Sequence, residues 1–234
     1  MAILIEDRKT RGPDGRPGFY PTTGILITRD WVLTVRHGFT KFRGKRYVPR
    51  LSVGATEGGK RVSLAISADR IFIHPTLDLA LVRVEGWNPP FSFRPARLAP
   101  PPPISEQVLL AGFGQTKDAP AGTSLRAVEE PVSAPAVVDS SRLPDLFPPH
   151  LAAHYMEIDQ RDGKGSCSGD SGGPVFRRVE DQLELVGIIA GNASFDGRHP
   201  CLEYSYAVRI DGAVDWIAAV TGKSFNLLTR AFQD

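Results

Sequence analysis

Residues 165–175 read Gly165-Ser-Cys-Ser-Gly-Asp-Ser171-Gly-Gly-Pro-Val175, and this stretch decides how the rest of the chain is interpreted. Ser171 has glycines close on both sides, and glycine permits backbone angles that other residues resist. A serine hydroxyl is a weak nucleophile until a neighbouring base takes its proton, and acyl transfer also needs N–H groups directed at the oxygen that becomes negative. A tight glycine turn can supply both. We therefore interpret Ser171 as a candidate nucleophile and the amides of Gly169 and Ser171 as candidate oxyanion donors.

Two simpler interpretations of this stretch are a Gly/Ser-rich surface loop and the Gly-x-Ser-x-Gly turn of the α/β-hydrolases. An α/β-hydrolase would place its acid and its histidine after the serine. Only roughly sixty residues follow Ser171, and they contain no βαβ pattern. The longer form of the stretch, with Cys167 before the serine and Pro174-Val175 after it, is also much rarer by chance than the short turn.

A histidine and an aspartate earlier in the chain have the positions that such a serine needs. The segments 24–28 and 31–35 read as two short apolar strands, and His37 follows directly. Asp78 stands at the head of an apolar run that is typical of a buried strand. Because a buried carboxylate without a partner is costly, a histidine ring is the partner that this chemistry would demand.

Three segments together resemble the chymotrypsin/trypsin-like serine proteases (S1 type): WVLTVRHG at 31–38, DLALVRV at 78–84 and GKGSCSGDSGGPV at 163–175. The chain order His37, Asp78, Ser171 is also the order of that family. The resemblance implies a serine endopeptidase in which Ser171 attacks a peptide carbonyl, His37 moves the proton and Asp78 orients the ring. It implies an oxyanion hole made by Gly169 and Ser171, and no metal or organic cofactor.

The resemblance also implies an all-β fold of two six-stranded antiparallel β-barrels with a C-terminal helix. We expect a first barrel at 1–88 with His37 and Asp78, a proline-rich linker at 89–104, and a second barrel with the helix at 105–234 that carries Ser171. The 23 glycines and 20 prolines agree with many turns and short strands. The resemblance extends over residues 24–220 and leaves out the first twenty.

The expected substrate pocket follows from the same resemblance. We assign it to five residues on two segments: Gly165, Ser166, Ala190, Gly191 and Asn192. Gly165 stands where trypsin-like members carry the aspartate that binds Arg or Lys, so a small or apolar side chain at the cleavage site is expected. Glu203 lies near the opposite wall and leaves a preference for basic residues open. Cys167 and Cys201 would pair beside this pocket.

Three positions depart from the pattern of the family. Gly38 stands where a cysteine is usual, and Ala190 where a serine usually supports the triad aspartate. Family members mature by cleavage, and the new N-terminal amine pairs with the acid before the serine. Here no activation motif such as IVGG is present, so Asp170 needs Ala2 after loss of Met1, or another partner. The sequence therefore leaves open an enzyme that is latent until a partner protein or a fused regulatory domain activates it.

Two other functions fit the same residues: a catalytically silent, protease-like binding module, and an esterase that uses the same triad. A net charge of +2 gives no case for nucleic acid or membrane partners, so protein or peptide substrates are expected. With only two cysteines, and with acidic residues directly after the first five residues, we expect a cytoplasmic protein, the alternative being a secreted mature domain.

Overall fold

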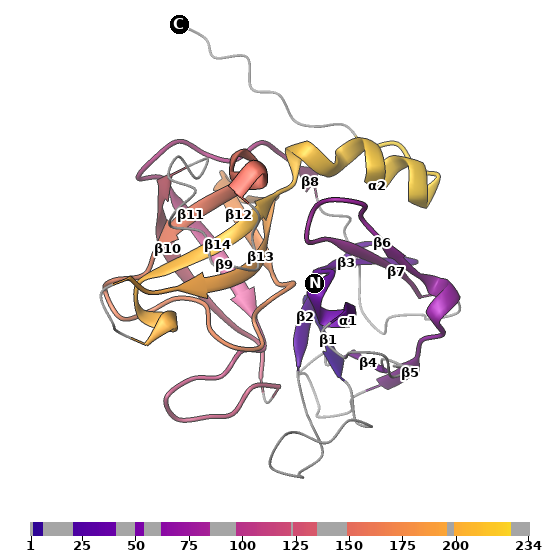
Figure 1. The fold of residues 1–234 in the computed structure, drawn as a ribbon, viewed down its shortest axis with the longest axis horizontal. Coiled ribbons are helices and arrows are strands. Elements are labelled where there is room, and N and C mark those ends of the chain that lie inside the picture. Colours follow the sequence, from indigo (N-terminus) through magenta and orange to yellow (C-terminus); the bar gives the residue numbers. More distant parts are fainter. Residues whose placement is uncertain are drawn as a thin grey trace, which may run out of the picture.

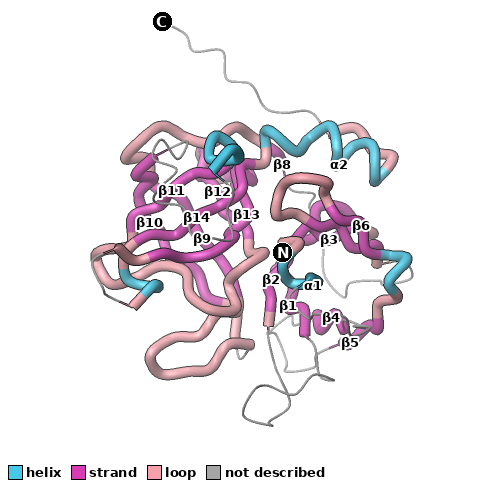
Figure 2. Tube along the Cα trace, in the orientation of Figure 1, coloured by secondary structure: helices cyan, strands magenta, loops and turns pink. Residues whose placement is uncertain are grey.

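The computed structural model describes residues 2–6, 21–40, 50–53, 62–84, 97–122, 124–134, 149–195 and 199–225. Their strands form two groups that lie side by side (Figure 1). Within the described ranges, helix is confined to short segments and to the C-terminal α2 (Val214–Thr221), which runs from the second group over the first (Figures 1 and 2). The all-β prediction with a C-terminal helix is confirmed.

The first sheet contains seven antiparallel strands in the order β5-β4-β1-β2-β3-β7-β6. Every residue of its central strand β2 is buried, which fits the run of β-branched and apolar residues there. Leu33 of β3 lies between Ile25 of β2 and Leu81 of β7, and all three are buried. The bounds of the elements are β1 (Ala2–Glu6), β2 (Thr22–Thr28), β3 (Trp31–Thr34), α1 (His37–Thr40), β4 (Arg50–Val53), β5 (Val62–Ala65), η1 (Ala68–Arg70), β6 (Ile71–Ile73) and β7 (Ala80–Arg83).

The second barrel is closed: six strands follow the order β12-β9-β10-β11-β14-β13, and β13 pairs back with β12. A seventh strand, β8, adds to β13 in parallel. Closure leaves none of the six strands as a free edge. The bounds are β8 (Arg97–Leu98), β9 (Gln107–Gly112), β10 (Arg126–Ala134), η3 (Pro149–His154), β11 (Tyr155–Asp159), β12 (Pro174–Val179), β13 (Gln182–Ala193), η4 (Pro200–Leu202), β14 (Tyr204–Arg209) and η5 (Asp211–Ala213).

Two details differ from the expected architecture. The segment 89–104, expected to be a linker without strands, contains β8, because Arg97 and Leu98 pair with Glu184 and Leu185 of β13. Residues 85–96 lie outside the described part of the chain. The first sheet has seven strands instead of six, and its strand β1 comes from the N-terminal residues that the resemblance left out.

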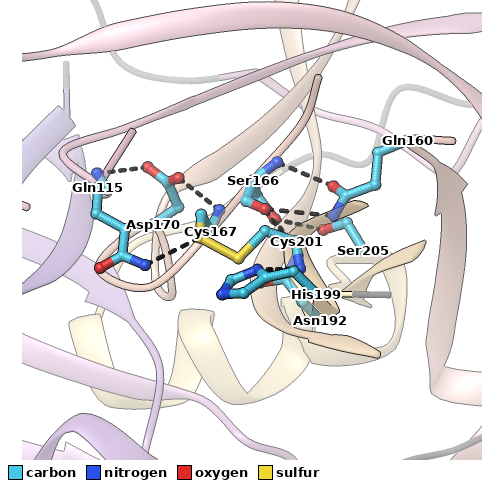
Figure 3. The surroundings of a disulfide bond; sticks show 10 residues. Gln115, Gln160, Ser166, Cys167, Asp170, Asn192, His199, Cys201 and Ser205 are labelled. Atoms are coloured by element: carbon cyan, nitrogen blue, oxygen red, sulfur yellow. Dashed lines mark hydrogen bonds between the residues drawn. A yellow bond between two sulfur atoms is a disulfide. The ribbon is translucent and has the colours of Figure 1, made fainter. Parts of the chain in front are cut away.

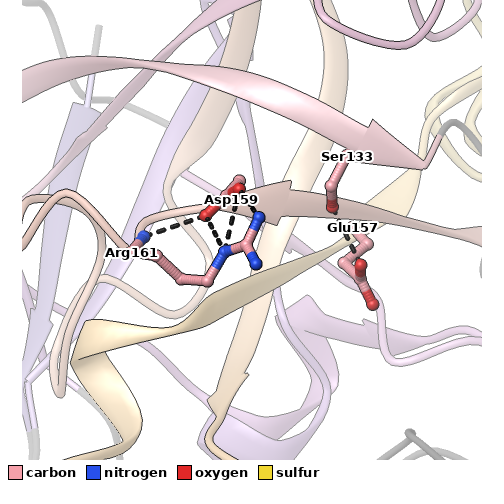
Figure 4. Close-up of polar contacts among 4 residues, drawn as sticks. All are labelled: Ser133, Glu157, Asp159 and Arg161. Carbon is pink, nitrogen blue, oxygen red and sulfur yellow. Dashed lines mark hydrogen bonds and ion pairs between the residues drawn. The ribbon is translucent and has the colours of Figure 1, made fainter.

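A buried carboxylate of the second barrel is paired with two hydroxyls. The buried Glu157 of β11 accepts hydrogen bonds from the Ser133 hydroxyl (2.9 Å) and the Tyr206 hydroxyl (3.0 Å). At the end of β11, the guanidinium of Arg161 binds the carboxylate of Asp159 (Figure 4). The Arg161–Asp159 pair is more exposed than Glu157 and adds ~1 kcal/mol at most. It lies in the turn that leads from β11 to the expected substrate pocket. No helix in the described ranges has the length and apolar character needed to cross a membrane.

Candidate active site

The pairing of β3 with β7 brings His37 and Asp78 together. Thr34, at the end of β3, lies opposite Ala80, at the start of β7, so the residues just beyond these strand ends are neighbours. Asp78 Oδ2 lies 2.6 Å from His37 Nδ1, and Asp78 Oδ1 accepts the backbone N–H of His37 at 2.8 Å. Since Asp78 is buried and holds both the ring and the backbone of His37, the imidazole has a fixed orientation.

His74 shapes the turn that carries Asp78. Its Nδ1 accepts the backbone N–H groups of Thr76 (3.2 Å) and Leu77 (2.9 Å), and its ring packs edge-on against Trp216 of α2. Burial lowers the pKa of His74, which favours the neutral ring that can accept these bonds. His74 is therefore a structural residue of this turn.

Ser171 lies against the start of β2, next to the residues that flank His37. Its carbonyl accepts the N–H of Thr23 at 2.8 Å, while the neighbouring Thr22 packs against Gly38, at the position where the family usually has a disulfide. The structure thus places His37 and Asp78 in direct contact, and Ser171 beside β2, the strand that pairs with the β3 strand before His37. Within the described residues no hydrogen bond joins the Ser171 hydroxyl to the His37 ring; such bonds often tighten only when substrate binds.

The two candidate oxyanion amides belong to peptide groups that are held by their carbonyls. Ser168 O accepts the N–H of Gln115 (2.8 Å), and Asp170 O accepts the N–H of Gly173 (2.8 Å). In a planar trans peptide the N–H points opposite to the C=O, so these bonds fix the directions of the Gly169 and Ser171 N–H groups. Across the described ranges neither N–H meets a protein acceptor. Both are free to donate to a bound oxyanion.

The carboxylate of Asp170 accepts hydrogen bonds from the backbone of two segments. Its carboxylate accepts the N–H groups of Gly114 (2.7 Å) and Cys167 (2.9 Å). Burial raises the pKa of Asp170, and these two hydrogen bonds oppose that rise. Gly112 and Gly114 are required here, because any Cβ at either position would collide with the carboxylate. A cavity of about 610 Å³ adjoins Asp170, with Arg126 among its lining residues.

Side chains from both expected pocket segments, Ser166 and Asn192, are joined by hydrogen bonds (Figure 3). Asn192 Nδ2 donates to the carbonyl of Ser166 (2.9 Å) and to its hydroxyl (2.8 Å), and that hydroxyl lies 2.7 Å from the Ser205 hydroxyl. Gln160 accepts the Ser166 N–H at 3.0 Å and lies against Gly165. No pattern in the sequence pointed to Gln160 or Ser205, since neither belongs to a motif.

The other expected pocket residues lie on the wall formed by β13. Ala190 is buried and Gly191 half-buried, and the pairing of β13 with β14 shifts between Ile189 and Gly191. Such a bulge beside a site re-aims the strand locally. Glu203 was the alternative residue at the bottom of the pocket. Its buried carboxylate accepts a hydrogen bond from the backbone N–H of Phe195, in the loop after β13.

Cys167 and Cys201 form a disulfide, the pairing that the resemblance implied. The structure adds His199, whose donor nitrogen lies with the two sulfurs inside a 4.8 Å cluster (Figure 3). The sequence did not single out this histidine. Metal ions bind thiolates, and the sulfurs of a disulfide are not thiolates, so the oxidised cluster lacks the ligands of a zinc site.

Fold and site together are those of a chymotrypsin-like serine hydrolase. The chain belongs to the trypsin family: the family model Trypsin matches residues 11–217. "Serine protease 1" of Canis lupus familiaris is 29% identical over 186 residues, which cover 75% of this chain and 71% of that protein. "Trypsin" of Sus scrofa is 28% identical over 162 residues, with 65% and 67% covered.

The solved structure of HL collagenase aligns with 96% of this chain and 94% of its own, at a TM-score of 0.67 and 22% identity. At that identity the likeness shows the fold alone. The predictions of the family and of the double-barrel fold are confirmed.

Proposed function

We propose that this member of the family is an active serine endopeptidase that uses His37, Asp78 and Ser171. The observation that carries the proposal is the double contact of Asp78 with His37, at 2.6 Å on the ring and 2.8 Å on the backbone. That contact directs Nδ1 at the carboxylate and leaves Nε2 as the atom able to take a proton from Ser171. The buried aspartate also stabilises the imidazolium that then forms.

The proposed reaction follows the general scheme of the family, which is the reference case for this type of site. Ser171 Oγ attacks the peptide carbonyl while His37 accepts its proton, and the amides of Gly169 and Ser171 stabilise the oxyanion. His37 next protonates the leaving amine, which departs and leaves an acyl-enzyme. A water molecule, deprotonated by His37, then releases the acid. Loss of one oxyanion donor typically lowers the rate on the order of 100-fold or more.

For the substrate we propose proteins or peptides with a small side chain at the cleavage site. Asn192 and Ser166 bond to each other across the pocket, which shortens it. The carboxylate of Glu203 is engaged by Phe195, which makes it a weaker candidate for binding a basic side chain.

The geometry of Asp170 supports activity without an activating partner. In the family, the acid at the position of Asp170 pairs with a new N-terminal amine. Because the sequence contains no activation motif, it left open an enzyme that is latent until a partner activates it. The N–H groups of Gly114 and Cys167 already meet its need for hydrogen bonds, and the oxyanion peptides are held in place. We therefore propose an enzyme that is active as folded, with latency and the silent binding module as the alternatives that the following experiment separates.

The test is labelling of the purified chain with a fluorophosphonate probe, followed by hydrolysis of a peptide library. Wild type should react, Ser171→Ala should not, and His37→Ala should react far more slowly. Ser67→Ala, at an exposed serine away from the site, serves as the control and should react like wild type. A wild type that neither labels nor hydrolyses peptides contradicts activity as folded; recovery with an added partner would then indicate latency, and no recovery the binding module.

The cellular compartment is a further proposal. The sequence favours the cytoplasm, with a secreted mature domain as the alternative, and the Cys167–Cys201 disulfide supports the alternative because disulfides persist in oxidising compartments. Acid-quenched alkylation of the protein from its native cells, before and after reduction, decides between them. Two thiols reactive before reduction would indicate a reducing compartment.

A further inference from the structure

Thr23 joins the first sheet to the serine loop of the second barrel. It is completely buried in β2. Its backbone N–H donates to Ser171 O at 2.8 Å, and its hydroxyl donates to Gly169 O at 2.8 Å, 146 positions away in the sequence. The same hydroxyl accepts the N–H of Phe113 at 3.0 Å. One small residue therefore contacts two separate segments, the serine loop and the segment that begins at Phe113.

We propose that Thr23 is a positioning residue for the oxyanion hole, because its hydroxyl holds the backbone of Gly169. The proposal rests on the proposed function above. Gly169 lies between two peptide groups: one carries the N–H expected to bind the oxyanion, and the other carries the carbonyl that Thr23 holds. With φ at +100°, Gly169 has the backbone freedom to rotate these groups relative to each other. The bond from Thr23 restricts that rotation.

The acceptor side of the same hydroxyl supports the Gly169 amide by a second route. Phe113 begins a short turn in which the Gly114 N–H binds Asp170 and the Gln115 N–H binds Ser168 O. These two contacts set the carboxylate next to Ser171 and the direction of the Gly169 N–H. Because Thr23 binds both this turn and Gly169, it ties the two together at a fixed spacing.

The buried position of Thr23 also explains why loss of its hydroxyl should lower kcat and not raise KM. Thr23 is completely buried and its hydroxyl is engaged by Gly169 and Phe113, so we expect it not to contact the substrate in the ground state. An interaction that matters only when negative charge develops lowers kcat and leaves KM nearly unchanged when it is removed. If the loss were only one of stability, any variant that is destabilised to the same extent would show the same fall in the fraction of active enzyme.

The experiment compares three variants of the full chain. Thr23→Val keeps the shape and removes the hydroxyl, Thr23→Ser keeps the hydroxyl, and Thr34→Val removes a neighbouring buried hydroxyl that donates to the Thr23 carbonyl. We expect Thr23→Val to lower kcat ~10- to 100-fold, below the full loss of one oxyanion donor, with KM within about 3-fold. Thr23→Ser should stay within about 3-fold of wild type, and Thr34→Val should lose stability like Thr23→Val but retain kcat.

An unchanged kcat in Thr23→Val, or an equal loss in Thr34→Val, would overturn the proposal. Hydrogen exchange of the 167–173 segment is a readout that does not depend on activity. It should accelerate in Thr23→Val and not in Thr34→Val, and equal exchange in both would also overturn it. If wild type itself hydrolyses no peptide, the proposed function fails while the exchange comparison still decides the role of Thr23.

Discussion

At the scale of the single residue, Asn192 is the side chain that we propose limits how deep a substrate side chain can enter the pocket. Its amide crosses from β13 to Ser166 with bonds of 2.9 and 2.8 Å. Asn192→Gly removes this crossing and should raise kcat/KM for substrates with Leu or Phe at the cleavage site by ~10-fold or more, because each added buried methylene contributes ~10- to 200-fold in specificity. Hydrolysis of matched Ala, Leu and Phe peptides measures the change.

The control is Asn192→Gln, which keeps an amide donor at this position and fills at least as much space, so it should retain the preference for the small residue. A glycine variant with the same order of preference as wild type would show that Asn192 does not limit the pocket.

Single residues also show what the sequence can and cannot reveal about the site. His37, Asp78 and Ser171 were predictable, because each stands in a local pattern whose chemistry is specific. Thr23 and Gln160 were not, since an isolated threonine or glutamine carries no sign of what it contacts. The partner of the Thr23 hydroxyl lies 146 positions away, and only the docking of two sheets brings it near.

At the scale of the element, the serine loop is tied to η4 by the Cys167–Cys201 disulfide, which spans 34 positions. Chain-entropy estimates for a loop of this size give about 4 kcal/mol of stability. Cys167→Ser with Cys201→Ser should therefore lower the free energy of unfolding by about that amount, and fluorophosphonate labelling should weaken because Cys167 N–H holds Asp170.

Denaturant unfolding of the double variant and of wild type, each with and without a reducing agent, measures the effect. Reduction should move wild type to the stability of the double variant and leave the variant itself unchanged. Equal stability of reduced and oxidised wild type would contradict the expectation.

The elements that the sequence missed are short or lack a period. β8 has two residues, too few for any alternation, and it is a strand because it pairs with β13. A proline usually interrupts a strand, but β10 runs through Pro131. Proline lacks a backbone N–H that could pair with a neighbouring strand. Pro131 lies opposite Gln107 at the end of the β9 pairing, and the pairing of β10 with β11 begins one residue later, at Val132. The longer strands were predictable because their apolar and β-branched runs are bounded by turn residues.

At the scale of the whole molecule, Glu130 makes stability depend on pH. The residue is 2% exposed, and in the described residues its Oε1 meets no hydrogen-bond partner. Burial, helped by the nearby charge of Asp162, raises the pKa of Glu130 from 4.5 to about 7. A carboxyl whose pKa is higher in the folded state stabilises the fold below pH 4.5, and that contribution is lost as the pH rises through about 7.

Glu130→Gln removes this titration. The variant should unfold at a higher temperature than wild type at pH 8 and gain less, or nothing, at pH 5, where the wild-type carboxyl is already mostly protonated. Thermal unfolding of both proteins at the two pH values tests this. A difference between variant and wild type that is the same at pH 5 and pH 8 would contradict the raised pKa.

The bond between Thr23 and Gly169 has a consequence for the protein during its synthesis on the ribosome. The base, the acid and Thr23 emerge early, while the nucleophile and both oxyanion amides emerge about a hundred residues later. A growing chain thus has no means of cutting itself or its neighbours through this site, because no fragment short of the serine loop contains the nucleophile. The proposed activity can therefore appear only after the serine loop itself has been synthesised.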